Sequence, residues 1–377
     1  MRFTLLEFSG SLGDLGTFIP LAVSMALVVG MDIGIILIFA GLFNILTGIL
    51  FGLPIPVQPM KAIAAVAIAE QMLPAEIAAA GLAMGGVLLV LGLTGWVEKL
   101  EKLVPLPVIR GIQLGIGLKL SIKGIEFITQ TGAFGLDSIS MALALGGITL
   151  LLRPTKTFPA ALLLLIIGVG ITLSATPLDT EYLRLSLSQF SFNFPNGTMW
   201  KNGILMGALP QLPLTILNSV IAICALSGDL FPGRKIAANR MASSVGLMNL
   251  LSCGFGAMPM CHGSGGLAGQ YHFGARTGGS VVMLGAGKLL VGLLFGGAAM
   301  RMLMHFPHSV LGIMLLFAGV ELAMPARDQK TRQQFLVMII TAVGIVAINT
   351  TVGVLLGLAT KLLVEARLFS NDTNPHK

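Results

Sequence analysis

A seven-residue pattern occurs twice in this chain, at a separation of 205 positions. The first copy is GLFNILT at residues 41–47, and the second is GLMNLLS at residues 246–252. At the same separation Pro54 matches Pro259, and after each proline the apolar pattern gives way to small or polar residues. Apolar segments interrupted at matching positions of two halves are typical of proteins that move a solute across a membrane. The interruptions then mark the solute's binding site.

The composition indicates a membrane protein. Hydrophobic residues make up 55% of the chain and charged residues only 10%, whereas a soluble domain has about 25% charged residues. The mean hydropathy is +0.91, and apolar runs of about bilayer-spanning length follow one another along the chain. These runs lack the two-residue alternation of membrane β-strands, so we expect an all-α polytopic membrane protein.

We predict fourteen transmembrane segments in two sets of seven. The first set covers residues 15–30, 33–53, 57–72, 75–96, 105–122, 136–152 and 158–176, and the second covers 204–226, 236–255, 259–271, 279–300, 306–325, 333–349 and 350–366. The third and tenth segments contain the interruptions and are too short to span a bilayer alone, so we expect them to be short and broken. The first repeat is then residues 1–176, the connecting loop 177–203, and the second repeat 204–377.

The charges indicate how the chain is oriented. Its net charge of +7 comes from Lys and Arg in short loops between the predicted segments. Most of them fall on one side, which by the positive-inside rule predicts that this side and both termini are cytoplasmic. We expect the membrane to be the plasma (inner) membrane. Because each half has an odd number of segments, the second half enters from the opposite face and the repeat is inverted. The excess of positive charge therefore reflects the orientation of the chain in the membrane, and we expect no nucleic-acid partner.

Nothing in the sequence indicates a cofactor or an enzyme. Cys224, Cys253 and Cys261 fall in or beside apolar segments without the spacing of metal ligands, so we interpret them as core residues and expect no cofactor and no metal. A Walker motif, a His-rich metal set and a Ser/His/Asp pattern are all absent from the sequence. A membrane-embedded enzyme is therefore not supported.

The two interruptions have the chemistry of an anion site. A helix that starts within the membrane exposes unpaired backbone N–H groups and the positive end of its dipole. Two such ends that converge from opposite sides bind an anion without a buried side-chain charge. Gly263, Gly265 and Gly266 let the backbone approach an oxyanion closely, while Ser264 supplies a hydroxyl and Gln58 supplies amide donors. Neutral donors of this kind suit a tetrahedral divalent oxyanion.

Four ionisable residues near these motifs need separate interpretation. Lys61 either faces the anion or extends to the membrane interface. His262 either titrates or is structural. Glu321 either carries a proton or lies at its helix end near Arg327. Asp14 is interpreted as the cap of the first membrane helix, near the interface.

Four motifs occur in order along nearly the whole chain and resemble those of the molybdate transporter family. They are GDLGTFIP at 13–20, PVQPMK at 56–61, QLPLT at 211–215 followed by Asn218, and PMCHGSGG at 259–266. That family is a branch related to the SulP sulfate permeases and lacks their C-terminal STAS domain. The resemblance implies the fourteen-segment fold that uracil transporters and anion exchangers share.

The resemblance also implies that the chain forms two domains with different roles in transport. A core domain would comprise residues 15–97 and 204–300, and a gate domain 105–176 and 305–367. The substrate would lie between segments 3 and 10, flanked by segments 1 and 8. The candidate binding residues are Thr17, Gln58, Met60, Lys61, Gln211, Thr215, Asn218, His262, Gly263, Ser264 and Gly265.

The function implied is secondary active import of molybdate by alternating access, through an elevator-like motion of the core against the gate. The alternatives are a sulfate permease and a nucleobase–proton symporter. Nucleobase members use carboxylates on segments 8 and 10, and those segments have none here. The residues do not distinguish molybdate from sulfate or tungstate, which share its charge and shape. A passive channel fits interrupted inverted repeats less well. The partners expected are the anion, the lipid bilayer and a second copy in a homodimer.

Accumulation of a divalent anion against a negative-inside potential requires a driving ion or an exchanged anion. A co-transported proton is the simplest candidate. No carboxylate is expected within the binding site, so His262 and Glu321 are the titratable groups predicted to couple transport to protons.

Overall fold

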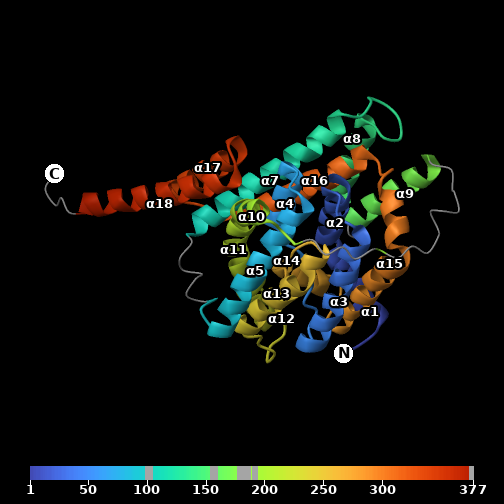
Figure 1. Cartoon of the computed structure of the whole chain (residues 1–377), viewed down its shortest axis with the longest axis horizontal. Helices are drawn as coiled ribbons and strands as arrows, with labels where there is room; N and C mark the ends of the chain where they lie inside the picture. The colour runs from blue at the N-terminus through green and yellow to red at the C-terminus, as the bar shows by residue number, and fades with distance from the viewer. Residues whose placement is uncertain (98–104, 153–159, 176–187, 189–193, 373–377) are drawn as a thin grey trace.

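The chain folds into helices, in a computed structural model that describes residues 1–97, 105–152, 160–175, 188 and 194–372 (Figure 1). The helices of the first half are α1 (Leu5–Ser11), α2 (Leu15–Val29), α3 (Ile33–Phe51), α4 (Lys61–Glu70), α5 (Pro74–Thr94), α7 (Leu106–Thr129), α8 (Ile139–Leu152) and α9 (Ala160–Ala175). Those of the second half are α10 (Gly197–Asn202), α11 (Leu209–Leu214), α12 (Ala222–Leu230), α13 (Ala238–Ser252), α14 (Ser264–His272), α15 (Gly279–Leu303), α16 (His308–Ala323), α17 (Arg332–Ala347) and α18 (Thr350–Asp372). Two short strands, β1 (Gln58–Pro59) and β2 (Met260–Cys261), pair with each other.

A helix lies in each of the fourteen predicted segments. Among the described residues, six helical stretches are long and apolar enough to cross a membrane: Leu5–Val29, Ile33–Phe51, Pro74–Thr94, Gly197–Leu230, Gly279–Leu303 and His308–Asp328. The prediction that the third and tenth segments are short is confirmed, because α4 has 10 residues and α14 has 9. Helices of this length rise about 14–15 Å, half of a hydrocarbon core. The count of fourteen membrane segments stays a prediction.

The eighth predicted segment differs most from expectation. Helix runs without a break from Gly197 to Leu230, so it begins inside the range predicted as the connecting loop; residues 177–187 and 189–193 of that loop lie outside the described part. Two stretches, Gly203–Ala208 and Thr215–Ile221, are π-helical. Pro210 and Pro213 lie between them and lack the N–H that a regular α-helix needs at those positions. Such π-helical insertions are rare and frequently occur at functional sites.

Helices of the two halves pack against each other in two equivalent pairs. α3 packs along α15, and α13 packs along α5. Since α3 and α13 carry the repeated sequence pattern, swapping the halves turns one pair into the other. The close contacts match as well. A Cβ added at Gly41 would lie 2.6 Å from the Gly285 carbonyl oxygen, and one added at Gly246 would lie 2.9 Å from that of Gly85. Only glycine permits helices to approach this closely, so the repeated glycine sets the same packing in both halves.

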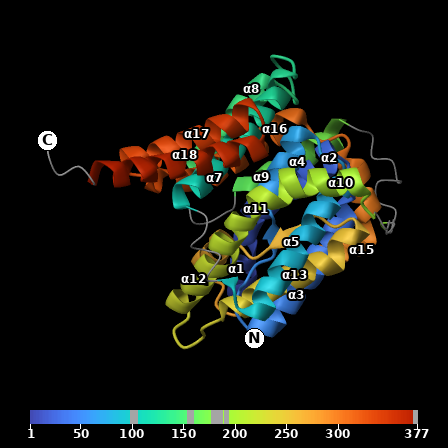
Figure 2. The same cartoon turned by 60° about the vertical axis from the view of Figure 1, so that its left-hand side comes forward.

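The helices form two groups, which Figures 1 and 2 show from two sides. One group contains α7, α8, α16, α17 and α18, with α7 packed along α16 and α17. The other contains α3, α5, α12, α13, α14 and α15. α2 and α4 lie where the groups meet, because α2 contacts α9 and α16 while α4 contacts α7.

Candidate functional site

The two interruptions meet in the middle of the fold. Residues 52–60, here called the first break, and residues 256–263, the second break, each contain one strand of an antiparallel pair. Gln58 lies opposite Cys261, and Pro59 lies opposite Met260. The Met60 N–H also donates to the Pro259 carbonyl at 2.8 Å. This pairing brings the N-termini of α4 and α14 together from the two halves.

Equivalent asparagines hold the two breaks. The Asn44 Oδ1 accepts the Val57 N–H at 2.9 Å, and the Asn249 Oδ1 accepts the Met260 N–H at 2.8 Å. These bonds make Val57 equivalent to Met260, a separation of 203 instead of 205 positions. Pro56, and not Pro54, is therefore the structural counterpart of Pro259. The stretch from Asn44 to Val57 is two residues longer than the stretch from Asn249 to Met260, which a fixed sequence offset does not reveal.

The N-terminus of α4 is already capped by a side chain. The Gln211 Oε1 accepts the backbone N–H groups of Ala62 at 2.8 Å and Ile63 at 3.2 Å. The Gln211 amide then donates to the Thr215 hydroxyl at 2.8 Å. Both side chains are buried. Two backbone N–H donors at the start of α4 are thus already bonded to a protein group. The π-helical stretch of the eighth segment begins at Thr215, the residue that accepts the Gln211 amide.

The N-terminus of α14 is different, because its first turn is not capped by a side chain. The first helical donor with a partner is the Leu267 N–H, which bonds the Gly263 carbonyl at 3.0 Å. The N–H groups of Ser264, Gly265 and Gly266 precede it and have no partner within the helix. Gly265 is exposed, and a Cβ there would meet no atom within 4 Å. The start of α14 therefore offers backbone donors and open space for an anion.

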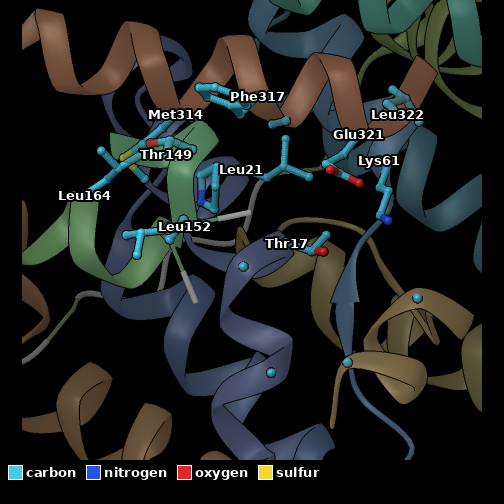
Figure 3. Close-up of a pocket in the computed structure, with 18 of the residues that line it drawn as sticks. Thr17, Leu21, Lys61, Thr149, Leu152, Leu164, Met314, Phe317, Glu321 and Leu322 are labelled. Carbon is cyan, nitrogen blue, oxygen red and sulfur yellow. The ribbon is translucent and has the colours of Figure 1, made fainter. Parts of the chain in front are cut away.

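A cavity of about 620 Å³ opens beside this helix start. Its wall includes Gly265 and Gly269 of α14, Lys61 at the start of α4 and Thr17 of α2. The opposite wall comes from α8, α9 and α16. Figure 3 shows that Lys61 and Glu321 project into the same end of the cavity, with Thr17 nearby. Apolar side chains, among them Leu164, Met314 and Phe317, line much of the remainder. The cavity thus lies between the two helix groups.

A buried ion pair lies behind the start of α14. The Asp14 Oδ1 accepts a hydrogen bond from the Gln58 Nε2 at 2.6 Å, and the Asp14 Oδ2 lies 3.6 Å from the Lys288 Nζ. The Lys288 ammonium also lies 3.6 Å from the centre of the Phe18 ring, a cation–π distance. Asp14 and Gln58 are fully buried, and Lys288 is 6% exposed.

The interpretation of Asp14 as a helix cap near the interface is wrong. Its side chain caps no backbone N–H of α2, because the chain reaches α2 through α1 and the helical turn Leu12–Asp14, which bury the carboxylate in the core. The expectation that no carboxylate lies within the binding site stays a prediction, although Asp14 lies against the first turn of α14. Glu321 also lines the cavity. A signal for Lys288 was present in the sequence, since a lysine within an apolar membrane helix is costly and is usually functional.

The remaining predicted residues lie in or behind the breaks. His262 is fully buried, with its Nδ1 3.0 Å from the Pro56 carbonyl and its Nε2 3.0 Å from the Ser244 hydroxyl. Met60 is fully buried at the residue before α4, and Gly263 packs so closely on the Gln58 side chain that a Cβ would collide with it. Ser264 and Asn218 are half-buried. Of the predicted binding residues, Thr17, Lys61 and Gly265 line the cavity.

Comparisons with known proteins agree with this arrangement. A family model described as molybdate transporter of the MFS superfamily matches residues 6–120 and 203–322. Molybdate transporter 2 of Arabidopsis thaliana is 41% identical over 96% of this chain and 87% of its own length. Molybdate transporter 1 of Chlamydomonas reinhardtii is 33% identical over 97% of this chain and 92% of its own length.

Solved structures show the same fold at low sequence identity. The transmembrane domain of a cyanobacterium bicarbonate transporter, BicA, superposes with a TM-score of 0.69 at 18% identity, covering 96% of this chain and 98% of that one. The murine Slc26a9 anion transporter in its inward-facing state superposes with a TM-score of 0.71 at 14% identity, covering 97% and 69%. The chain is thus a multi-pass membrane transporter and not an enzyme. It belongs to the molybdate transporter family.

Proposed function

We propose that this protein imports molybdate by alternating access, with the oxyanion bound at the start of α14. The observation that carries the proposal is the uncapped first turn of α14, which opens onto a cavity that Lys61 also lines. Backbone donors and a helix dipole favour an anion at such a place. The relatives named as molybdate transporters support this substrate.

The two helix starts have unequal roles in this proposal. Ser264, Gly265 and Thr17 contact the oxyanion, and Lys61 supplies a positive charge. Gln58, Met60, Gln211, Thr215 and Gly263 hold the breaks in place behind it, as do His262 and the half-buried Asn218. The unequal capping supports this division, because Gln211 already uses two donors of α4. A single uncapped helix start binds an anion less tightly than two, which suits a substrate that must also leave.

The transport motion proposed is an elevator. The core would comprise residues 15–97 and 204–300, and the gate 105–176 and 305–367, within a 7+7 inverted repeat of fourteen segments. Two observations support it: the helices form two groups (Figures 1 and 2), and the cavity lies between them. The exchange of packing partners between the halves supports the inverted repeat. The cytoplasmic termini, the plasma (inner) membrane and the homodimer stay predictions from the sequence.

Proton co-transport is part of the proposal. Inward movement of a divalent anion opposes a negative-inside potential by about 2.3 kcal/mol per charge per 100 mV, and co-transported protons offset that cost. Glu321 lies on the cavity wall, where a proton and the anion could both reach it. His262 supports coupling less well, because both ring nitrogens lie at hydrogen-bond distance from protein groups.

Sulfate is the second candidate substrate, since backbone donors recognise any tetrahedral dianion, and tungstate would bind for the same reason. A nucleobase is disfavoured because the second break and α14 carry no carboxylate to recognise its ring. The decisive test is uptake of labelled molybdate into proteoliposomes, with sulfate, tungstate and uracil as competitors. We expect tungstate to compete and uracil to have no effect. Absence of molybdate uptake, or uptake blocked by uracil, would refute the proposal.

A further inference from the structure

A cluster of buried polar atoms without hydrogen bonds surrounds Asp14. Within the described part of the chain, the Asp14 Oδ2, the Gln58 Oε1 and the Lys288 Nζ are all buried and lack a hydrogen-bond partner. Buried polar atoms are normally satisfied, so unsatisfied ones need a reason. Three in one cluster, at the centre of a membrane protein, indicate a site whose occupancy changes.

The elements around Asp14 contribute few charges. α15 supplies Lys288, and α4 supplies Lys61, whose charge acts on Asp14. β1 supplies the neutral Gln58, and β2 supplies the Cys261 thiol, which interacts electrostatically with Asp14. α14 supplies only Gly266, where an added Cβ would lie 2.8 Å from the Asp14 Oδ1. Asp14 is therefore the one carboxylate among these groups.

The carboxylate also lies directly behind the uncapped donors. Its contact with Gly266 places it against the first turn of α14, and its neighbours Gly13 and Gly16 line the cavity. A divalent oxyanion at the start of α14 would bring two negative charges close to a third in a dry environment. Such an arrangement favours the neutral form of the carboxyl group.

We propose that Asp14 is a proton-binding site that loads together with the oxyanion; this inference rests on the proposed function. The proton binds the Oδ2, which has no hydrogen-bond partner, while the Oδ1 continues to accept from Gln58. Neutral Asp14 leaves Lys61 and Lys288 to balance the two charges of the anion. Gln58, Lys288 and α14 belong to the proposed core, and Asp14 directly precedes it and is bound to Gln58 and Lys288. The proton would therefore cross the membrane with the anion. Glu321, on α16 of the proposed gate, would stay behind.

The first experiment needs no variant. Molybdate is titrated into the purified wild-type protein by calorimetry in buffers of different ionisation enthalpy, which gives the number of protons bound with each anion. We expect uptake of about one proton per anion near neutral pH. Binding without proton uptake would overturn the inference and leave the proposed function intact. Failure of the wild type to bind or transport molybdate would overturn both.

The second experiment locates the proton. Asp14→Asn keeps the acceptor for Gln58 but cannot ionise, and Asp14→Asn with Lys288→Met also removes the lysine charge that would otherwise be unpaired. We expect whichever variant folds to exchange molybdate across proteoliposomes with no proton taken up. The control is Glu126→Gln, half-exposed on α7, which should keep the wild-type number of protons per anion. Glu321→Gln, on the cavity wall, tests the competing carboxylate, and the assignment to Asp14 predicts that this variant still takes up a proton with the anion.

The outcomes separate the alternatives. Proton uptake that persists in either Asp14 variant, or that disappears in Glu321→Gln, would refute the assignment to Asp14. If both Asp14 variants fail to fold, the decision rests on the number of protons taken up per molybdate by the wild type and by Glu321→Gln. Loss of proton uptake in Glu321→Gln refutes the inference, and its retention supports the inference.

Discussion

Asn44 and Asn249 make equivalent hydrogen bonds in the two halves: each side-chain oxygen accepts a backbone N–H of a break, at 2.9 Å for Val57 and 2.8 Å for Met260. They are not equal in strength. Asn249 also donates to the carbonyls of Met260 and Val245, at 2.6 and 2.7 Å, whereas the Asn44 Nδ2 is buried without a partner. The second break is therefore the more firmly held.

Alanine at each asparagine should reveal this difference. Asn44→Ala leaves one buried N–H unsatisfied, which costs about 1–3 kcal/mol. Asn249→Ala leaves both polar groups of Met260 without their partner and should lower the unfolding temperature further. Thermal unfolding of the purified protein measures both, with the exposed Asn239→Ala on the same helix as the control. An equal loss in the two variants would contradict the unequal bonding.

Substitutions at Gln211 separate capping from anion binding. Gln211→Ala removes the acceptor for the Ala62 and Ile63 N–H groups and should destabilise the protein by about 0.5–2 kcal/mol, as loss of a helix cap does. Gln211→Glu keeps the acceptor but adds a negative charge beside the proposed site, so it should fold and bind the oxyanion less tightly. Unfolding temperature and KM for molybdate uptake give the two readouts. A glutamate variant with wild-type KM would mean that the anion lies far from α4.

Ser264 and Gln58 are expected to affect affinity by different routes. Ser264→Ala removes a hydroxyl at the start of α14, and a hydrogen bond to a charged group contributes about 1.5–3 kcal/mol, or roughly tenfold or more in affinity. Gln58→Ala should weaken binding as well, because it removes the hydrogen bond that Gln58 donates to the Asp14 carboxylate behind the start of α14. Calorimetric binding to the purified variants tests both, with the exposed Ser174→Ala as the control. Wild-type affinity would remove the residue concerned from the site.

Glycines 263 and 265 should respond in opposite ways to a side chain. A Cβ at Gly265 meets open space, so Gly265→Ala should fold, while the larger Gly265→Leu should occupy the space beside the helix start and block uptake without lowering the unfolding temperature. At Gly263 even alanine collides with the Gln58 side chain, so Gly263→Ala should destabilise the protein. Full transport by Gly265→Leu would show that the start of α14 is a packing surface only.

Uptake should rise as the external pH falls, because a co-transported proton becomes more available. Vesicle assays between about pH 5.5 and 8, with the voltage clamped by potassium and valinomycin, measure this dependence. Neutralising the cavity-wall carboxylate by Glu321→Gln tests the prediction made from the sequence, in which this change blunts the pH dependence. The Asp14 assignment predicts instead that the dependence survives in Glu321→Gln. A flat profile in the wild type would exclude proton coupling altogether.

The local pattern was enough to place a helix in each predicted segment and to locate the two breaks, although α1 and the start of the helix at Gly197 were not predicted. Apolar runs define membrane helices because lipid offers no other partner for backbone polar groups, and the GLFNILT and GLMNLLS copies identify the helices that precede each break. The short lengths of α4 and α14 followed from the same pattern. The π-helical stretches of 197–230 did not, because backbone distortion at Pro210 and Pro213 depends on what packs around it.

Only the tertiary structure decided which polar side chains interact with residues far away in the sequence. Asp14 looked like a cap because capping is a local role, yet its partners are Gln58, 44 residues away, and Lys288 in the other half. Gln211 was predicted as a binding residue, and only the structure shows that its oxygen accepts the N–H groups of Ala62 and Ile63. Sequence periodicity determines which face of a helix is apolar. Which buried charges and amides satisfy one another is determined by where the helices cross, and that depends on packing over the whole fold.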